Sequence, residues 1–274
     1  MRKRVSFIIL ILVFAAGLSL LLYPTISDYI NSRHQSRAIT DYASSVSELD
    51  DATSEQIWNS AQEYNTELNR LKTGLSLPES KLEEYYSQLN IADDGIMGYI
   101  DIPSIQCTLP IYHGTEEAVL QVGVGHVEGS SLPVGGESSH SVISGHRGLP
   151  SSKLFSKLDR LKKGDRFTLH VLNRVLTYEV DQILTVLPDE INSLTICDGE
   201  DLCTLVTCTP YGINSHRLLV RGHRVANQSE EGVAVTADAV QIEPLLVALF
   251  MAAPLMLILL VILIISIRKE GSRR

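Results

Sequence analysis

A cysteine and an arginine flank a short turn late in the chain. Cys208 ends an apolar run rich in Leu, Val and Thr, and Arg217 opens the next run after a Pro-Tyr-Gly-Ile-Asn segment. The pattern predicts a strand, a loop and a second strand, with a thiol and a guanidinium at the two lips of the loop. A thiolate is a nucleophile and a fixed cation stabilises an oxyanion. The pair therefore has the residue types that covalent acyl chemistry needs.

His146 is the histidine best placed to serve such a cysteine. It stands between glycines in the sequence Gly-His-Arg-Gly at 145–148, directly after an apolar run, where small neighbours leave room for a substrate. A thiol with a pKa near ~8.5 is only slightly ionised at neutral pH, and a neighbouring imidazolium raises the thiolate fraction. The other histidines lack this setting and are predicted to be structural: His34, His113, His126, His140, His170, His216 and His223.

Two alternatives compete with these assignments. Taken alone, a cysteine in an apolar run such as Cys208 is usually an inert buried residue. Side chains alternate along a strand, so Cys203 faces away from Cys208 and is predicted to be a packed core residue. Arg221 shares a face with Arg217 and is the rival for the oxyanion role, but its distance from the loop makes it the second choice.

The four cysteines do not indicate a metal site. Cys107, Cys197, Cys203 and Cys208 match no pattern of paired C-x-x-C knuckles, and no acidic cluster has the spacing of an EF-hand, so we expect no cofactor and no calcium. Cys197 and Cys203 are close enough in sequence to bridge a short loop, which leaves their redox state open.

Apolar runs near both ends predict two membrane spans. The run at 5–22 follows three basic residues, and the longer run at 245–267 precedes a basic tail at 268–274. By the positive-inside rule both termini are cytoplasmic and the part between lies outside the cell. The first segment, 1–26, also fits a cleaved signal peptide, which would leave a single-pass protein; we favour the uncleaved anchor.

The charge distribution argues against nucleic acid as a partner. The whole chain carries a net charge of −9, and basic residues gathered at its ends leave the middle more acidic still. Binding to a phosphate backbone requires basic surface. Basic or amine-bearing substrates suit such a surface, although solubility alone explains the charge.

Residues 27–90 are predicted to be mainly helical. Thr53 and Gln56 fit a capping box, and an apolar stripe follows that indicates a helix packed on the next domain, or, less favoured, a dimerising coiled coil. The stripe consists of Ile57, Ala61, Tyr64, Leu68 and Leu71. Pro78 and its neighbours break the pattern at 74–80 before a second short helix.

Residues 91–226 have the residue composition and spacing of a mostly β domain. Short runs rich in Ile, Val and Tyr alternate with Gly and Pro, which predicts a closed or nearly closed barrel of about seven to eight strands. Helix is expected there only at 151–161 and in part of 115–122. The acidic, aperiodic segment 227–244 is predicted to tether the domain to the membrane.

The sequence Thr-Leu-Val-Thr-Cys at 204–208 resembles the sortase signature, with His146 and Arg217 at the positions of the sortase histidine and arginine. The start of the β domain, the Ser-Leu-Pro-Val-Gly-Gly segment at 131–136, the Ser-Gly-His-Arg-Gly-Leu-Pro segment at 144–150 and the C-terminal span are similar to class C, the pilin-polymerising branch. The resemblance is strong over about 91–226 and looser in the flanking parts.

This resemblance implies a cysteine transpeptidase of Gram-positive bacteria with a sortase-type barrel between two transmembrane helices. Cys208 would attack an LPXTG-like sorting signal of a pilin, His146 would protonate the leaving amine, and Arg217 would hold the carbonyl or oxyanion. A lysine amine of the next pilin would then resolve the thioester. The alternatives are a sortase that anchors proteins to peptidoglycan and a membrane-tethered scaffold module without catalysis.

The chain departs from class C at the lid that usually precedes the barrel, because it lacks an Asp-Pro-aromatic motif there. In its place stand Leu77, Pro78, Glu79 and Ser80, which resemble the start of a sorting signal with serine for threonine. One hypothesis is that 74–80 occupies the groove as a pseudo-substrate lid. The favoured alternative is a solvated turn between two helices.

Overall fold

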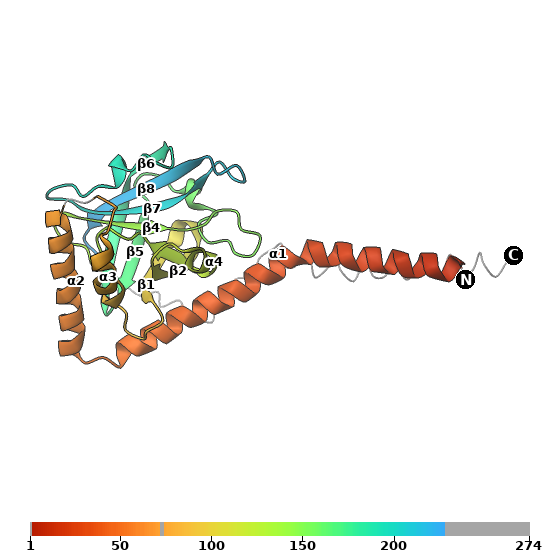
Figure 1. The fold of residues 1–274 in the computed structure, drawn as a ribbon, viewed down its shortest axis with the longest axis horizontal. Helices are drawn as coiled ribbons and strands as arrows, with labels where there is room; N and C mark the ends of the chain where they lie inside the picture. The colour runs from red at the N-terminus through yellow and green to blue at the C-terminus, as the bar shows by residue number, and fades with distance from the viewer. Residues whose placement is uncertain (1, 72–73, 228–274) are drawn as a thin grey trace. The chain divides into compact units, whose positions relative to one another are not determined.

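The computed structural model describes residues 2–71 and 74–227 (Figure 1). Residues 26–228 form one compact unit, and residues 1–25 belong to a separate unit. The predicted span at 245–267, the tail at 268–274 and all of the tether at 227–244 except Asn227 lie outside the described residues.

Eight strands close into a barrel in the order β1-β2-β3-β4-β7-β8-β6-β5 (Figure 1). The β2–β3 and β4–β7 pairs are parallel, and the remaining reported pairs are antiparallel. The predicted closed, mostly β fold is therefore confirmed. The strands are β1 (Ile96–Ile102), β2 (Cys107–His113), β3 (Val124–His126), β4 (Ser139–Ser144), β5 (Arg166–Val171), β6 (Arg174–Val186), β7 (Asp201–Thr209) and β8 (His216–Val225).

The barrel interior is filled by alternate side chains of its strands. In β5, Phe167, Leu169 and Val171 are buried while their neighbours are only partly covered. Successive residues of a strand point to opposite faces, so one face of each strand supplies the core. Cys203 of β7 is fully buried in this core, as predicted. Packing of the interior fixes the register of β7, and hence the position of the residues at its end.

The described residues include four α-helices: α1 (Arg2–Ser47), α2 (Asp51–Leu71), α3 (Leu82–Ser87) and α4 (Glu117–Val122). Helix α1 extends well beyond the predicted apolar run at 5–22 and continues through Pro24. A proline removes one hydrogen bond from a helix, and a long helix tolerates that loss. The stretch Val13–Ser47 is long and apolar enough to cross a membrane, a criterion that a signal sequence also meets.

The second helix packs on the barrel through the predicted stripe. Ala61, Tyr64 and Leu68 are buried in the same cluster as the barrel core, whereas Leu71 is exposed. The helix begins one turn earlier than the proposed capping box. Asp50 Oδ1 accepts a hydrogen bond from the backbone N–H of Thr53 at 2.6 Å, so Asp50 caps the helix.

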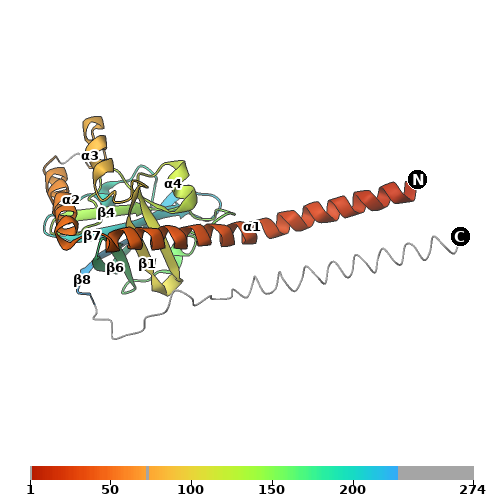
Figure 2. The same ribbon diagram turned by 90° about the horizontal axis from the view of Figure 1, so that it is seen from below.

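The third helix lies beside the second (Figures 1 and 2). Lys81 bridges them, with its Nζ 2.8 Å from Glu67 and 2.9 Å from Glu84. Tyr85 of α3 is fully buried, and its hydroxyl hydrogen-bonds the imidazole of His126 on β3 at 2.9 Å. The end of the segment that leads into α3 is therefore fixed.

The expected helix at 151–161 is not formed. The structure has turns there, a single bridge between Leu149 and Ser152, and one short 3-10 helix at Leu158–Arg160. Side chains of α1 form hydrogen bonds with the backbone of this segment, in place of the backbone hydrogen bonds of a helix. Asp28 accepts from the backbone N–H of Lys153 at 2.9 Å, and Asn31 donates to the carbonyl of Ser151 at 2.8 Å.

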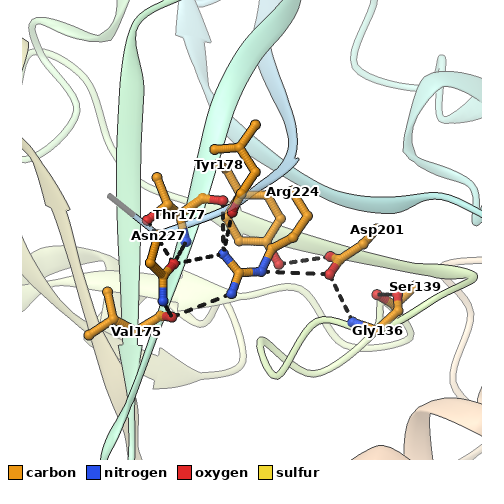
Figure 3. Close-up of polar contacts among 9 residues, drawn as sticks. Gly136, Ser139, Val175, Thr177, Tyr178, Asp201, Arg224 and Asn227 are labelled. Atoms are coloured by element: carbon orange, nitrogen blue, oxygen red, sulfur yellow. Dashed lines mark hydrogen bonds and ion pairs between the residues drawn. The ribbon is translucent and has the colours of Figure 1, made fainter. Parts of the chain in front are cut away.

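Polar contacts fix the end of β8 where the described chain ends (Figure 3). Asp201 accepts hydrogen bonds from the Tyr178 hydroxyl at 2.9 Å and from the backbone N–H of Gly136 at 2.9 Å. Arg224 approaches the same carboxylate at 3.9 Å and donates to Asn227 at 3.1 Å. Burial raises the pKa of Asp201, although these hydrogen bonds act in the opposite direction. The network ties β7 to the last residues of the barrel.

Candidate active site

Three strand ends meet at one edge of the barrel. In the antiparallel β7–β8 pair, Cys208 lies directly opposite Arg217. In the parallel β4–β7 pair, Ser144 is level with Val206, so His146 lies two residues beyond the last paired position, as Cys208 does on β7. The structure thus brings the three predicted site residues together from three neighbouring strands.

Hydrogen bonds continue the β4–β7 alignment past the end of β4. The backbone N–H of Gly145 donates to the carbonyl of Val206 at 3.0 Å, and the Thr207 hydroxyl donates to the carbonyl of Gly145 at 2.7 Å. The backbone N–H of Phe155 also donates to the carbonyl of His146 at 3.1 Å. Hydrogen bonds therefore fix the backbone at Gly145 and His146, while the His146 side chain remains partly exposed.

Cys208 differs from the other cysteines in its surroundings. Burial raises the pKa of Cys107 to about 12, and it raises the pKa of Cys203 well above the usual range, so both remain thiols. Cys197 is exposed on the loop before β7. All four cysteines are free, so the structure contains no Cys197–Cys203 bridge. Cys208 alone combines partial exposure with a histidine and an arginine at the neighbouring strand ends.

The hydrogen bonds of Arg217 occupy only part of its guanidinium. Its Nη1 donates to the carbonyls of Asn214 at 3.3 Å and His216 at 3.2 Å. A guanidinium carries five N–H donors. Within the described part of the chain no hydrogen bond from its Nη2 is found, which leaves a fixed cationic donor opposite the thiol.

The rival arginine is already engaged. Arg221 bonds the carboxylate of Asp181 at 2.6 and 3.1 Å, and it lies opposite Thr204 rather than Cys208. Four residues of strand correspond to about 13 Å. Of the two arginines, Arg217 is the one that lies beside Cys208.

Two residues that we did not select from the sequence lie next to the site. Glu117 of α4 places its Oε2 3.4 Å from Nε2 of His146. A hydrogen bond from Gln121, and then the contact with His146, lower the pKa of Glu117. Arg147 contacts the residue after Cys208, with Nη1 3.3 Å from the Thr209 hydroxyl.

The segment 74–80 lies along the outside of the barrel. Leu75 touches Gly129 and packs against an apolar cluster that includes Val142 and Val206. Leu77 instead packs between α2 and α3, while Pro78, Glu79 and Ser80 are exposed. A cavity of about 310 Å³ adjoins Leu75 and is also lined by residues of α2, of β4 and of the loops before β4 and β7.

A sortase domain family model matches residues 100–225, the region that contains all three strand ends. The crystal structure of sortase C1 from Streptococcus agalactiae is 55% identical, covers 70% of this chain and 100% of its own, and superposes with a TM-score of 0.69. The chain belongs to the sortase family. Sortase C of Streptococcus pneumoniae is 47% identical, with 70% and 98% of the two chains covered and a TM-score of 0.64.

These neighbours confirm the class C resemblance. A further one is the X-ray structure of Clostridium perfringens sortase C with a C-terminal cell wall sorting motif, 46% identical with a TM-score of 0.62 over 70% of this chain and 99% of that one. Among curated proteins, Bacillus subtilis sortase D is 33% identical over 131 residues, which is 47% of this chain and 63% of the relative. The chain spans about half to two thirds of the curated relatives it matches, from 47% to 63% for the first three.

Proposed function

We propose that this sortase is a membrane-bound cysteine transpeptidase that joins pilin subunits outside the cell. The observation that carries the proposal is the meeting of Cys208, His146 and Arg217 at three neighbouring strand ends. Such a constellation supplies a nucleophile, a proton donor and an oxyanion partner. The apolar stretch of α1 supports attachment to a membrane, and a two-pass topology is proposed from the sequence.

The first half of the reaction is cleavage of a sorting signal. The Cys208 thiolate attacks the carbonyl carbon of the Thr–Gly bond of an LPXTG-like motif. Arg217 donates a hydrogen bond to the resulting oxyanion. His146 gives its proton to the departing glycine amine as the carbon–nitrogen bond breaks, which leaves a thioester between the pilin and Cys208.

The second half transfers the pilin to an amine. A lysine amine of a neighbouring pilin attacks the thioester, its proton passes to His146, and the Cys208 thiolate leaves. An isopeptide bond is formed and the starting protonation of the site is restored. The chemistry needs no cofactor.

The relatives favour pilin polymerisation over the alternatives. The S. pneumoniae sortase C structure is described as informative on pilin substrate specificity, and the C. perfringens one contains a sorting motif. Anchoring of surface proteins to peptidoglycan would use the same site with a different amine. A non-catalytic scaffold would have no need for Cys208, His146 and Arg217 at one edge of the barrel.

Replacement of the nucleophile tests the proposal. In a strain that expresses the full chain with its pilins, we expect Cys208→Ala to reduce high-mass pilus polymer by more than about a thousandfold. Cys197→Ala is the matched control, because it removes an exposed thiol outside the site. Undiminished polymer in the Cys208→Ala strain would refute catalysis. Loss of wall-anchored protein with unchanged polymer would identify the peptidoglycan reaction instead.

A further inference from the structure

Arg147 follows the histidine of the site, yet its side chain points into the protein. Only 9% of that side chain is exposed. Nη2 of Arg147 lies 2.6 Å from Asp159, and Nη1 lies 3.3 Å from the hydroxyl of Thr209. Thr209 is the residue directly after Cys208. One guanidinium therefore joins the loop after β4 to the end of β7.

The turn after Cys208 packs against the loop that follows β4. The guanidinium carbon of Arg147 lies 5.9 Å from the centroid of the Tyr211 ring. At Gly148 that ring fills the space a side chain would occupy, since an added Cβ would lie 2.9 Å from it. The residues that follow His146 and the residues that follow Cys208 thus form one contact surface.

This arrangement is costly for stability. The Arg147 guanidinium is largely removed from water, which carries a desolvation penalty, while the side chain of Asp159, its ion-pair partner, is 44% exposed. The Nε–H of Arg147 is buried and has no hydrogen-bond partner among the described residues. Buried polar groups without partners are uncommon in native proteins. A gain other than stability accounts for an arginine here.

We propose that Arg147 is a positioning residue that fixes the separation of the Cys208 thiol and the His146 imidazole. It does so by holding Thr209, and through it the end of β7, against the loop that carries His146. The proposal rests on the proposed function, because the separation matters only if His146 transfers a proton to the amine that leaves the carbon attacked by Cys208. A displacement of about 1 Å in such a pair can reduce the rate by about a hundredfold.

The effect should appear in the chemical step more than in binding. For hydrolysis of an LPXTG-type peptide by the full chain in detergent micelles, we expect Arg147→Met to lower kcat by about 10- to 100-fold and to leave KM within about twofold. Arg147→Lys keeps the charge but cannot span Asp159 and Thr209 with a planar fork, so it should rescue little. Thr209→Val keeps the shape of the side chain and should reproduce part of the loss.

Alkylation of Cys208 gives a readout that a merely structural role would not change. Iodoacetamide reacts with the thiolate, so its rate against pH reports the thiol and its partner. We expect Arg147→Met to move this profile to higher pH. The matched control is Arg166→Met, which removes an arginine paired with Glu179 at 2.8 Å on β5 and β6. The control should keep the wild-type kcat and the wild-type profile.

The outcomes separate the alternatives. Wild-type kcat and alkylation in folded Arg147→Met would overturn the proposal, and so would a lower Tm with unchanged kinetics. If Arg147→Met does not fold, Thr209→Val decides, and a wild-type profile for that variant overturns the proposal. A failed proposed function would show itself differently, as pilus polymer that persists in the Cys208→Ala strain.

Discussion

At the scale of single residues, Glu117 has the most direct contact with the site. Its carboxylate is exposed and lies 3.4 Å from the His146 imidazole. It is held on the other side by Gln121, one turn further along α4. This contact restrains the orientation of the His146 imidazole. Solvent screens an exposed pair, so the contribution is expected to be small.

We therefore expect Glu117→Gln to lower kcat/KM for peptide hydrolysis by about two- to fivefold. Steady-state kinetics at neutral pH measure this loss. Glu116→Gln is the control, since the neighbouring Glu116 contacts Tyr86 instead. An equal loss in both variants would contradict a specific role for Glu117.

The sequence was sufficient to predict the positions of the residues near strand ends. It was insufficient for the residues that reach the site from other elements. Cys208 and Arg217 are set by the alternation of two adjacent strands, and His146 by its glycine-flanked position. Glu117 comes from a helix 29 residues away, and no periodicity links it to His146. Arg147 was visible in the motif, but its inward orientation depends on contacts with Asp159 and Thr209.

At the scale of elements, periodic sequence patterns predicted helices and strands correctly, whereas irregular stretches such as 151–161 were predicted wrongly. The stripe of α2 and the strands from β4 onward follow from period and composition. Strand β2, which contains Pro110, and the three-residue strand β3, which follows Gly123, are not evident as separate strands from the sequence. The 151–161 segment has helical spacing, but α1 side chains bond its backbone and stabilise turns. Tertiary contacts override weak local preference.

The segment 74–80 gives a test at this scale, where the pseudo-substrate lid remains a prediction. Leu75 packs on the apolar cluster that contains Val206, two residues before Cys208. Removing its partly buried side chain weakens that contact by roughly 1 kcal/mol. We expect Leu75→Ser to raise hydrolysis of an LPXTG-type peptide by about fivefold, measured as kcat/KM.

Leu77→Ser is the matched control for this variant. Leu77 packs between α2 and α3, away from the Val206 cluster, so its replacement should lower Tm without raising hydrolysis. Deletion of 74–80 should act like Leu75→Ser. Unchanged hydrolysis in both the deletion and the Leu75→Ser variant would leave 74–80 as a turn between two helices.

At the scale of the whole molecule, a buried histidine makes the barrel sensitive to acid. His126 is fully buried, and burial lowers its pKa from 6.5 to about 4. Its Nε2 lies 2.8 Å from the carbonyl of Ser131, so Nε2 carries the proton, and Nδ1 accepts from the Tyr85 hydroxyl. Burial also lowers the pKa of His113 and His140. The folded state therefore holds these imidazoles neutral.

The sign of the pH effect follows from proton uptake. Below pH 6.5 the unfolded chain protonates His126 and the folded chain does not, so the folded state loses stability as pH falls towards 4. For His126 alone the loss is about 3 kcal/mol. Asp201, with its raised pKa, acts in the opposite direction near pH 4. Urea unfolding at pH 4.5 and 7 measures the slope.

We expect His126→Asn to reduce this slope and His34→Asn, which replaces an exposed imidazole on α1, to leave it unchanged. His126→Asn should also lower stability at pH 7, because the Tyr85 hydroxyl loses its imidazole partner. A wild-type slope in His126→Asn would contradict the assignment of acid sensitivity to this residue.

The position of β8 in the barrel sets the order in which the site residues come together as the chain is synthesised. β8 is the last strand in the described part of the chain, it inserts between β7 and β6, and its second residue is Arg217. Closing the barrel and bringing Arg217 opposite Cys208 are therefore the same event. On the proposed mechanism, a chain whose synthesis is incomplete holds Cys208 and His146 before it holds the oxyanion donor. We expect such a chain to be inactive towards the peptide bonds around it until β8 is in place.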